Sequence, residues 1–314
     1  MPTMTHSFSS VRGRSRLTRE EDGSAREQKR EHISVMTKEV LHYLAPQDGE
    51  VVVDATFGAG GHSKALKTAA RIRLIALDAD PLSASDTQHV VEANFADLAS
   101  VIKKSLPVGK QVDKVLFDLG WNAGQLNSGR GFSFVRDEPL SMAYGTKPAS
   151  GFTAAEILNE WDEATLANVF YGYGEERYAR PIAKAVIRRR TLQPIYTTEE
   201  LVEIIRDATP ARYHRGRIHF ATRVFQALRI ATNDELGAIE RGLAAAWEHL
   251  SCGGRIVVIT FHSIEDRAVK KIFAAYAKNG GKLVVKKPVV PGREEVRHNP
   301  RSRSAKLRVI EKIC

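Results

Sequence analysis

Short apolar runs alternate with helix-like stretches along the first half of the chain. This alternation predicts a parallel sheet with helices on both of its faces. The strand pattern stops after the fourth run and resumes only near residue 255. The predicted strands are residues 51–54, 74–78, 90–94, 114–119, 255–260, 282–286 and 306–310. The fold class expected from this pattern is α/β, with strands at both ends of the chain forming one sheet.

The interruption contains helical periodicity without a convincing strand, which predicts a helical domain inserted after the fourth strand at residues 123–222. A helix from about residue 218 to 250 is expected to lead back into the sheet. The α/β core then comprises residues 32–122 and 223–314, and residues 1–31 form a leader without globular patterning.

The first strand runs into a glycine-rich turn, Asp54-Ala-Thr-Phe-Gly58-Ala-Gly60-Gly61-His62, and a helix-like stretch follows. Glycines allow the backbone to approach a ligand closely, and a helix N-terminus offers free N–H groups. Asp78 ends the next strand, at the position where a carboxylate can bind the hydroxyls of a ribose. The pattern therefore predicts a nucleotide-cofactor site.

Two cofactors fit such a turn, and its details favour S-adenosylmethionine over NAD. A dinucleotide fold spaces its glycines as G-x-G-x-x-G to clear a pyrophosphate, whereas this chain has G-x-G-G. S-adenosylmethionine has no phosphate, so one carboxylate with free backbone amides suits it better. Phe95, after the third strand, is either a stacking surface for the adenine or an ordinary core aromatic.

The composition narrows the class of protein. A net charge of +10 and a pI of about 9.6 indicate a polyanionic partner such as nucleic acid, or else a merely basic enzyme. The two cysteines are too few for a disulfide framework and favour a reducing compartment. No apolar stretch approaches the length of a membrane span.

The leader is basic at its start, with no Asp or Glu in its first 19 residues and four arginines among Ser and Thr. This composition is typical of a mitochondrial transit peptide. Its periodicity is poor, so a disordered basic tail is the alternative.

A basic stripe at helical spacing crosses the predicted insert at Arg177, Arg180, Lys184 and Arg188. Such a stripe is either a solvated face or part of a nucleic-acid groove. A second basic cluster at residues 212–217 and a basic C-terminal segment favour the groove. Pro181, within the same stretch, either kinks the helix or lies in its first turn.

Several ordered segments resemble the RsmH or MraW family, the small-subunit ribosomal RNA (cytosine-N4)-methyltransferases, which has a mitochondrial counterpart. The resemblance runs from His32 to about Lys312. The matching segments are His32-Ile-Ser-Val-Met, Thr56-Phe-Gly-Ala-Gly-Gly-His62, Asp118-Leu-Gly120, Gln125-Leu126, Arg130-Gly-Phe-Ser-Phe134, Tyr173-Gly-Glu-Glu176, Ala221-Thr-Arg-Val-Phe-Gln-Ala-Leu-Arg-Ile230, Thr260-Phe-His-Ser-Ile-Glu-Asp-Arg267 and Asn299-Pro-Arg-Ser-Arg-Ser-Ala-Lys-Leu-Arg308.

The resemblance implies a class I, Rossmann-like S-adenosylmethionine methyltransferase core with a helical insert, acting on ribosomal RNA within the small subunit or its precursor. Together with the turn, it places the cofactor at Asp54, Gly58, Gly60, Gly61, His62, Asp78, Phe95, Asp118 and Gln125. No metal is required, because alignment of the nucleophile with the methyl group supplies much of the rate. The expected catalytic residues are Asp118, which accepts hydrogens of the amine, and His262, which removes a proton or is merely a structural histidine.

Two segments depart from the family pattern near the expected substrate pocket. After Gly120 the chain reads Trp121-Asn122-Ala123 where a small residue and Ser-Ser are usual, and residues 141–143 lack a carboxylate and a guanidinium. A catalytically degenerate homologue that binds cofactor and ribosomal RNA as an assembly factor is therefore the alternative function. A nicotinamide oxidoreductase is disfavoured by the glycine spacing. The expected location is the mitochondrion, or the cytoplasm for a bacterial protein, and the sequence leaves the oligomeric state undecided.

Overall fold

The structure is a computed structural model that describes Met1 and residues 33–80, 90–120, 123–126 and 128–314. The leader lies outside the described residues, as do Trp121 and Asn122 of the first altered segment. No helix in the part of the chain that the structure describes is long and apolar enough to cross a membrane.

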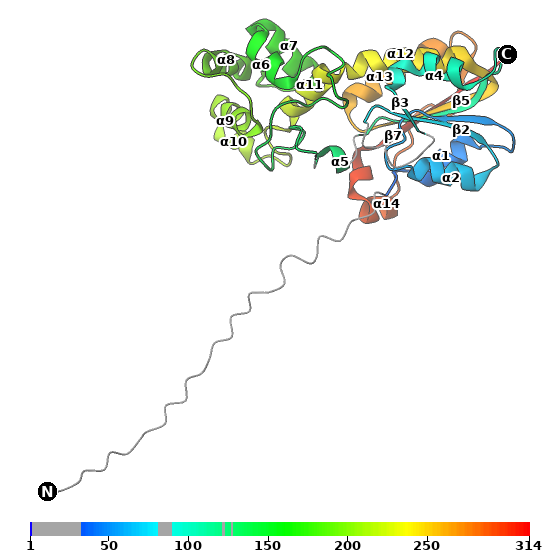
Figure 1. Cartoon of the computed structure of the whole chain (residues 1–314), viewed down its shortest axis with the longest axis horizontal. Helices are drawn as coiled ribbons and strands as arrows, with labels where there is room; N and C mark the ends of the chain where they lie inside the picture. The colour runs from blue at the N-terminus through cyan, green and yellow to red at the C-terminus, as the bar shows by residue number, and fades with distance from the viewer. Residues whose placement is uncertain (2–32, 81–89, 121–122, 127) are drawn as a thin grey trace. The chain divides into compact units, whose positions relative to one another are not determined.

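A single mixed sheet forms the core, with the strand order β3-β2-β1-β4-β5-β7-β6 (Figure 1). The strands are β1 (Val51–Asp54), β2 (Arg73–Asp78), β3 (Val90–Glu92), β4 (Val112–Asp118), β5 (Leu250–Thr260), β6 (Gly281–Leu283) and β7 (Lys306–Lys312). The first five run parallel, whereas β7 is antiparallel to both β5 and β6. Chain order reverses direction between β1 and β4, and ligands bind outside the carboxyl ends of the strands at such a switch point.

Alternate strand residues supply two hydrophobic cores, one on each face of the sheet. Val51 and Val53 belong to the face covered by α4, α12 and α13, while Val52 belongs to the face covered by α1 and α2 (Figure 1). These helices and their connections are α1 (Thr37–Leu44), α2 (Gly61–Ala69), η1 (Phe95–Asp97), α4 (Leu98–Ser105), α12 (Glu235–His249), α13 (Ser263–Tyr276), α14 (Arg293–His298) and η2 (Pro300–Ser304). The predicted doubly wound α/β fold is confirmed.

The segment after β4 is helical, as the missing strand pattern predicted. Its helices are α5 (Ala123–Leu126), α6 (Ala154–Glu160), α7 (Glu163–Gly174), α8 (Ala179–Arg190), α9 (Thr198–Ala208), α10 (Ala211–His214) and α11 (Thr222–Asn233). The helices from α6 to α11 share a third hydrophobic core, which extends along α11 as far as Ala231. Helix α11 therefore packs with the insert, although the sequence analysis had assigned residues 223–314 to the α/β core.

The long helix expected over residues 218–250 is two helices, α11 and α12, separated by Asp234. Asp234 adopts a left-handed conformation with φ 45°, which breaks the ladder of helical hydrogen bonds. In α8 the structure selects one of the two readings of Pro181. The helix begins at Ala179, so Pro181 lies in its first turn, where the missing N–H costs nothing.

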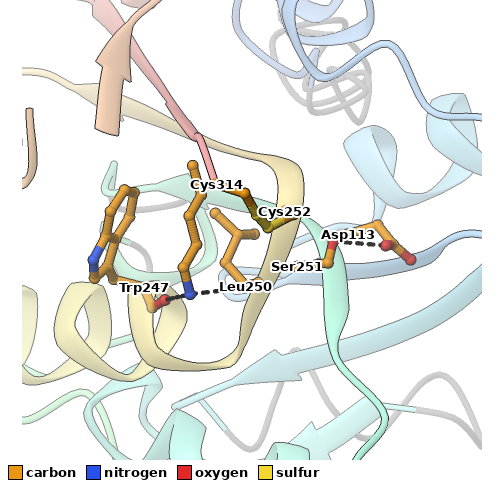
Figure 2. Close-up of a disulfide and its surroundings, with 7 residues drawn as sticks. Asp113, Trp247, Leu250, Ser251, Cys252 and Cys314 are labelled. Atoms are coloured by element: carbon orange, nitrogen blue, oxygen red, sulfur yellow. Dashed lines mark hydrogen bonds between the residues drawn. A yellow bond between two sulfur atoms is a disulfide. The ribbon is translucent and has the colours of Figure 1, made fainter. Parts of the chain in front are cut away.

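The two cysteines are joined as a disulfide between the start of β5 and the end of the chain (Figure 2). The Cα atoms of Cys252 and Cys314 are 5.7 Å apart, an ordinary span for such a bond. Nearby, Ser251 donates a hydrogen bond of 2.8 Å to Asp113 on β4. A single pair is no disulfide framework, as the cysteine count predicted.

Candidate active site

The glycine-rich turn connects β1 to α2 at the carboxyl edge of the sheet. Gly60 is the N-cap of α2 and has φ 76°, a conformation that favours glycine. A Cβ atom on Gly60 would collide with the ring of Phe57, and one on Gly61 would collide with the hydroxyl of Ser34. The turn is therefore built so closely that both positions require glycine.

Asp78 fastens this turn to the end of β2. Its Oδ2 accepts a hydrogen bond of 2.7 Å from the N–H of Gly58, and its Oδ1 accepts one of 2.8 Å from the N–H of Asp80. Burial raises the pKa of the Asp78 carboxyl, while the two N–H groups oppose that rise. The structure thus places Asp78 where a ribose was expected, and it adds a second role in shaping the turn.

Asp54 lies beneath the turn and is fully buried. Its carboxylate accepts a hydrogen bond of 2.6 Å from the hydroxyl of Ser63 and one of 3.3 Å from the N–H of Thr56. Burial raises the pKa of this carboxyl, and the bond from Ser63 counteracts it. Because its bonds go to the turn and to α2, Asp54 helps to fix the shape of the turn.

Asp118 and His62 meet at the centre of the edge. Asp118 ends β4, and its N–H donates a 2.7 Å hydrogen bond to the hydroxyl of Thr56 in the turn. The Oδ2 atom of Asp118 is 3.4 Å from Nε2 of the buried His62. Burial lowers the pKa of His62, but the carboxylates of Asp118, Asp54 and Glu295 outweigh it, so the pKa is raised overall.

Three polar atoms of this pair have no hydrogen-bond partner among the described residues although they are buried. They are both ring nitrogens of His62 and Oδ1 of Asp118. Buried polar atoms normally have partners, and unpaired ones point to a ligand or water that completes them. A bound molecule with polar groups at this point would complete the hydrogen bonding.

A pocket adjoins the carboxyl ends of β2, β3 and β4. Its walls come from the sheet edge on one side and from the insert with α12 and α13 on the other. Residues lining it include Ala79, Phe95, Leu119, Tyr144, Asn233 and Glu235. Phe95 also makes an edge-to-face contact with Phe117 of the core, at 5.7 Å between ring centroids. Phe95 thus packs on the core and also lines the pocket, so its position is compatible with both readings.

Gln125 lies in α5, just after the sheet edge, and is buried. Its carbonyl accepts hydrogen bonds from the N–H and the hydroxyl of Ser128 at 3.2 and 2.7 Å. The Ser128 hydroxyl in turn accepts a hydrogen bond of 2.9 Å from Nε of Arg130. Gln125 is thus tied to the loop that begins the insert.

Arg130 connects the insert to the sheet, a function that the sequence pattern did not assign to it. One Nη atom is 2.7 Å from Oδ2 of the buried Asp80, after β2, and the other donates to the carbonyls of Ala143 and Tyr144 at 3.2 and 2.6 Å. The signal in the sequence was only that Asp80 closely follows Asp78 and that Arg130 opens the Arg-Gly-Phe-Ser-Phe segment.

The second altered segment is held by its backbone. The N–H of Met142 donates a hydrogen bond of 2.7 Å to the carbonyl of Arg130. The carbonyl of Met142 accepts one of 2.7 Å from the side-chain amide of Asn233. Its neighbour Tyr144 donates a 2.8 Å hydrogen bond from its hydroxyl to Glu235, and burial raises the pKa of Tyr144 well above its usual value. Tyr144 lines the pocket, and the hydrogen bonds of Met142 fix the backbone of the altered segment beside it.

His262 lies at the start of α13 and caps it. Its Nδ1 accepts from the N–H of Glu265 at 3.4 Å, and its Nε2 is 2.9 Å from Oε1 of Glu265. These contacts favour the structural reading of His262. Glu235, His262 and Glu265 are close enough to hold a metal ion, but the guanidinium of Arg229 pairs with Glu235 at 2.7 Å and lies 4.0 Å from Glu265.

The first described residues and α14 pack around the glycine turn. The N–H of Met36 donates a hydrogen bond of 2.6 Å to Oε1 of Glu295. The side-chain amide of Asn299 donates one of 3.1 Å to the carbonyl of Ile33. Ser34 contacts Gly61, and Glu295 acts electrostatically on His62. Two motifs from opposite ends of the sequence thus support the same turn, which no local pattern in either one indicates.

Comparison with known proteins agrees with this geometry. Residues 29–313 match the family model described as the MraW methylase family. The ribosomal RNA small subunit methyltransferase H of Heliobacterium modesticaldum is 43% identical over 311 residues, covering 90% of this chain and 98% of that protein. The protein of the same name from Neorickettsia sennetsu is 42% identical over 293 residues, covering 90% of this chain and 96% of its own. This chain belongs to the MraW methylase family.

Proposed function

We propose that this methylase transfers the methyl group of S-adenosylmethionine to the N4 amine of a cytidine in small-subunit ribosomal RNA. The unpaired Oδ1 of Asp118, buried at the end of β4 beside the glycine turn, carries the proposal. The relatives named above carry the ribosomal RNA specificity in their names and match nearly the whole chain.

The described residues fit this cofactor. The N–H groups of the turn and of the first turn of α2 suit the carboxylate of its methionine part. Phe95 offers a ring to the adenine, and Asp78 lies at the strand end where a ribose binds. The cofactor supplies a methyl group on a positively charged sulfur, for which the carboxylates of Asp54 and Asp118 provide a favourable negative environment.

Asp118 has the chemistry to help a poor nucleophile. The lone pair of the cytosine amine is delocalised into the ring, and a carboxylate that accepts the amine hydrogens makes the nitrogen more nucleophilic. As nitrogen bonds to the methyl carbon, the carbon–sulfur bond breaks and its electron pair stays on sulfur. The extra proton on nitrogen passes to the Asp118 carboxylate. Nε2 of His62 lies 3.4 Å from that carboxylate and interacts with it electrostatically.

The insert supplies a surface for the RNA. The side chains of Arg177, Arg180, Lys184 and Arg188 are exposed, and none makes an ion pair within the described part of the chain. Arg180, Lys184 and Arg188 line one open groove on α8, which is also lined by two carboxylates, Glu163 of α7 and Asp207 of α9. Unpaired cations along a groove favour phosphate contacts over a neutralised, solvated face.

The decisive experiment is transfer of a labelled methyl group into immature small ribosomal subunits, followed by mass spectrometry of the RNA. We expect one N4-methylcytidine that depends on the protein and on the cofactor. Tight cofactor binding without any transfer would instead support the binding-only assembly factor.

The leader is proposed to direct the protein to mitochondria, on its composition alone. Residues 1–31 fused to a fluorescent reporter in eukaryotic cells test this directly. Diffuse signal throughout the cytosol would contradict it.

A further inference from the structure

Four aromatic rings follow one another across the insert, outside the cofactor pocket. Phe134 stacks on His219 with centroids 4.4 Å apart, and His219 lies 4.3 Å from Phe220. Phe220 in turn lies 4.6 Å from His214 at the end of α10. Phe220 is buried, but His219 is exposed and the other two are half-buried. Phe220 belongs to the hydrophobic core of the insert and Phe134 packs against that core, so the run joins the core to a solvent-exposed ring at His219.

The run continues past α10 to the start of the basic stripe. Tyr213, next to His214, lies 5.0 Å from Tyr178, and the guanidinium of the exposed Arg177 stacks over both rings at 4.7 and 4.9 Å. Tyr213 is fixed by a 2.6 Å hydrogen bond from its hydroxyl to the fully buried Glu176. This end of the run is therefore held rigidly although its rings are partly exposed.

The other end of the run approaches the cofactor pocket. Phe132, two residues before Phe134, stacks on Tyr144 with centroids 5.6 Å apart and planes 11° from parallel. Tyr144 lines the pocket that contains Phe95. We call the surface formed by Phe132, Phe134, His219, His214, Tyr213, Tyr178 and Arg177 the aromatic track.

Exposed arginines flank the aromatic track. Arg206 lies over the ring of Phe220 at 5.9 Å, and Arg212, Arg215 and Arg217 surround the loop after α10. None of the four makes an ion pair with a carboxylate in the residues that the structure describes. Partial burial and the positive charge of the nearby Arg206 lower the pKa of His219.

We infer that the aromatic track binds unpaired nucleotides adjacent to the target cytidine, so that the RNA enters the site as a single strand. Aromatic rings that alternate with cations suit single-stranded nucleic acid, because every base has a face that stacks and every linkage carries a phosphate. A duplex buries its base faces and cannot use the rings. The inference rests on the proposed function for its substrate, and it adds the strandedness and the path of the RNA.

The test measures binding of a short fluorescein-labelled single-stranded RNA, and of the same sequence as a duplex, to the full chain over a range of salt. His219→Ala should weaken single-strand binding about tenfold, within the range measured for loss of one stacked base, without changing the salt slope. His219→Phe should retain binding because the ring remains. Tyr196→Ala is the matched control, since Tyr196 is 61% exposed on the same insert and lies outside the track.

Combined replacement of Arg212, Arg215 and Arg217 by Ala should weaken binding and reduce the salt slope by about two, at roughly 0.7 for each lost contact with a single strand. The inference is wrong if His219→Ala binds the single strand as tightly as the parent does. It is also wrong if duplex and single strand bind the parent equally and lose affinity equally in the variant. Absence of methyl transfer with the single-strand preference intact would overturn the proposed function and leave the track standing.

Discussion

Nε2 of His62 lies 3.4 Å from Oδ2 of Asp118, and the two residues come from different elements of the sheet edge. His62 begins α2 after β1, whereas Asp118 ends β4, which is the neighbour of β1. The two side chains therefore interact electrostatically at the switch point of the sheet, where β1 and β4 are neighbours. This interaction also joins the residue proposed to face the amine to the turn proposed to hold the cofactor.

Replacing Asp118 by Asn should lower the pKa of His62. In the parent, burial lowers this pKa but the carboxylates outweigh it and raise the value above 6.5. A raised pKa means that the stabilisation is fully present below the unfolded value and is lost as the pH rises through the folded value. NMR titration of the imidazole, assigned with His62→Gln, measures the midpoint. An unchanged midpoint in Asp118→Asn would show that the pair is not coupled.

The same substitution should reduce methyl transfer by about a hundredfold or more, the lower end of what a positioned acid–base group supplies. The reason is that Asn offers an NH2 group where the amine hydrogens need an acceptor. Cofactor affinity should fall much less. Single-turnover transfer with labelled cofactor measures the rate, and Glu248→Gln, at an exposed carboxylate near the end of α12, is the control. A rate within a few-fold of the parent would remove Asp118 from the chemistry.

Asp78→Ala should weaken binding of S-adenosylmethionine about tenfold or more, because a hydrogen bond to a charged group contributes roughly 1.5–3 kcal/mol. The variant also releases the N–H of Gly58, so the turn loses its anchor on β2. Calorimetric titration gives the affinity, and Glu248→Ala, at an exposed position near the end of α12, serves as the control. Parent-like affinity would exclude Asp78 from the cofactor site.

The basic stripe should contribute to RNA affinity independently of sequence. Changing Arg177, Arg180, Lys184 and Arg188 to Ala removes four exposed cations and should flatten the salt dependence of binding. The control removes four exposed lysines from the core helices α2 and α4, namely Lys64, Lys67, Lys103 and Lys104. If the stripe variant and the control variant gave the same salt slope, the stripe would be a solvated face.

Tyr144→Phe should destabilise the protein by about 1 kcal/mol, as expected for the loss of one hydrogen bond to a buried partner. Its ring stacks on Phe132 and remains in the variant, while the hydroxyl that donates to Glu235 is lost. Urea unfolding measures the change in free energy. Tyr144→Ala should cost more, because it also removes the ring. A Phe variant as unstable as the Ala variant would show that stacking contributes little.

The strands and the glycine turn could be predicted because each depends on a few consecutive residues. Val51, Val52 and Val53 read as a buried strand whatever surrounds them, and Gly60 and Gly61 mark a turn by their own conformational freedom. The break at Asp234 could not be predicted, because the residues on either side favour helix and only the packing of α11 on the insert separates them.

The roles of individual side chains were harder to predict from the sequence than the strands and the turn. Asp54 and Asp78 are equivalent as carboxylates at strand ends, yet Asp54 points into the fold and Asp78 holds the turn. His262 follows β5 at the same edge, but its cap on α13 and its contact with Glu265 depend on the neighbouring turn. Arg130 needed the three-dimensional structure, because its partner Asp80 lies far away in the sequence.

The position of β7 bears on how the protein is made. This strand contains nearly the last residues of the chain, yet it lies inside the sheet, between β5 and β6. During synthesis the strands from β1 to β5 emerge first, and β5 keeps an unpaired edge until residues 306–312 have left the ribosome. The carbonyl and amide groups of that edge attract other strands while they are open. The open edge of β5 is therefore protected from wrong pairing only once β7 has formed beside it.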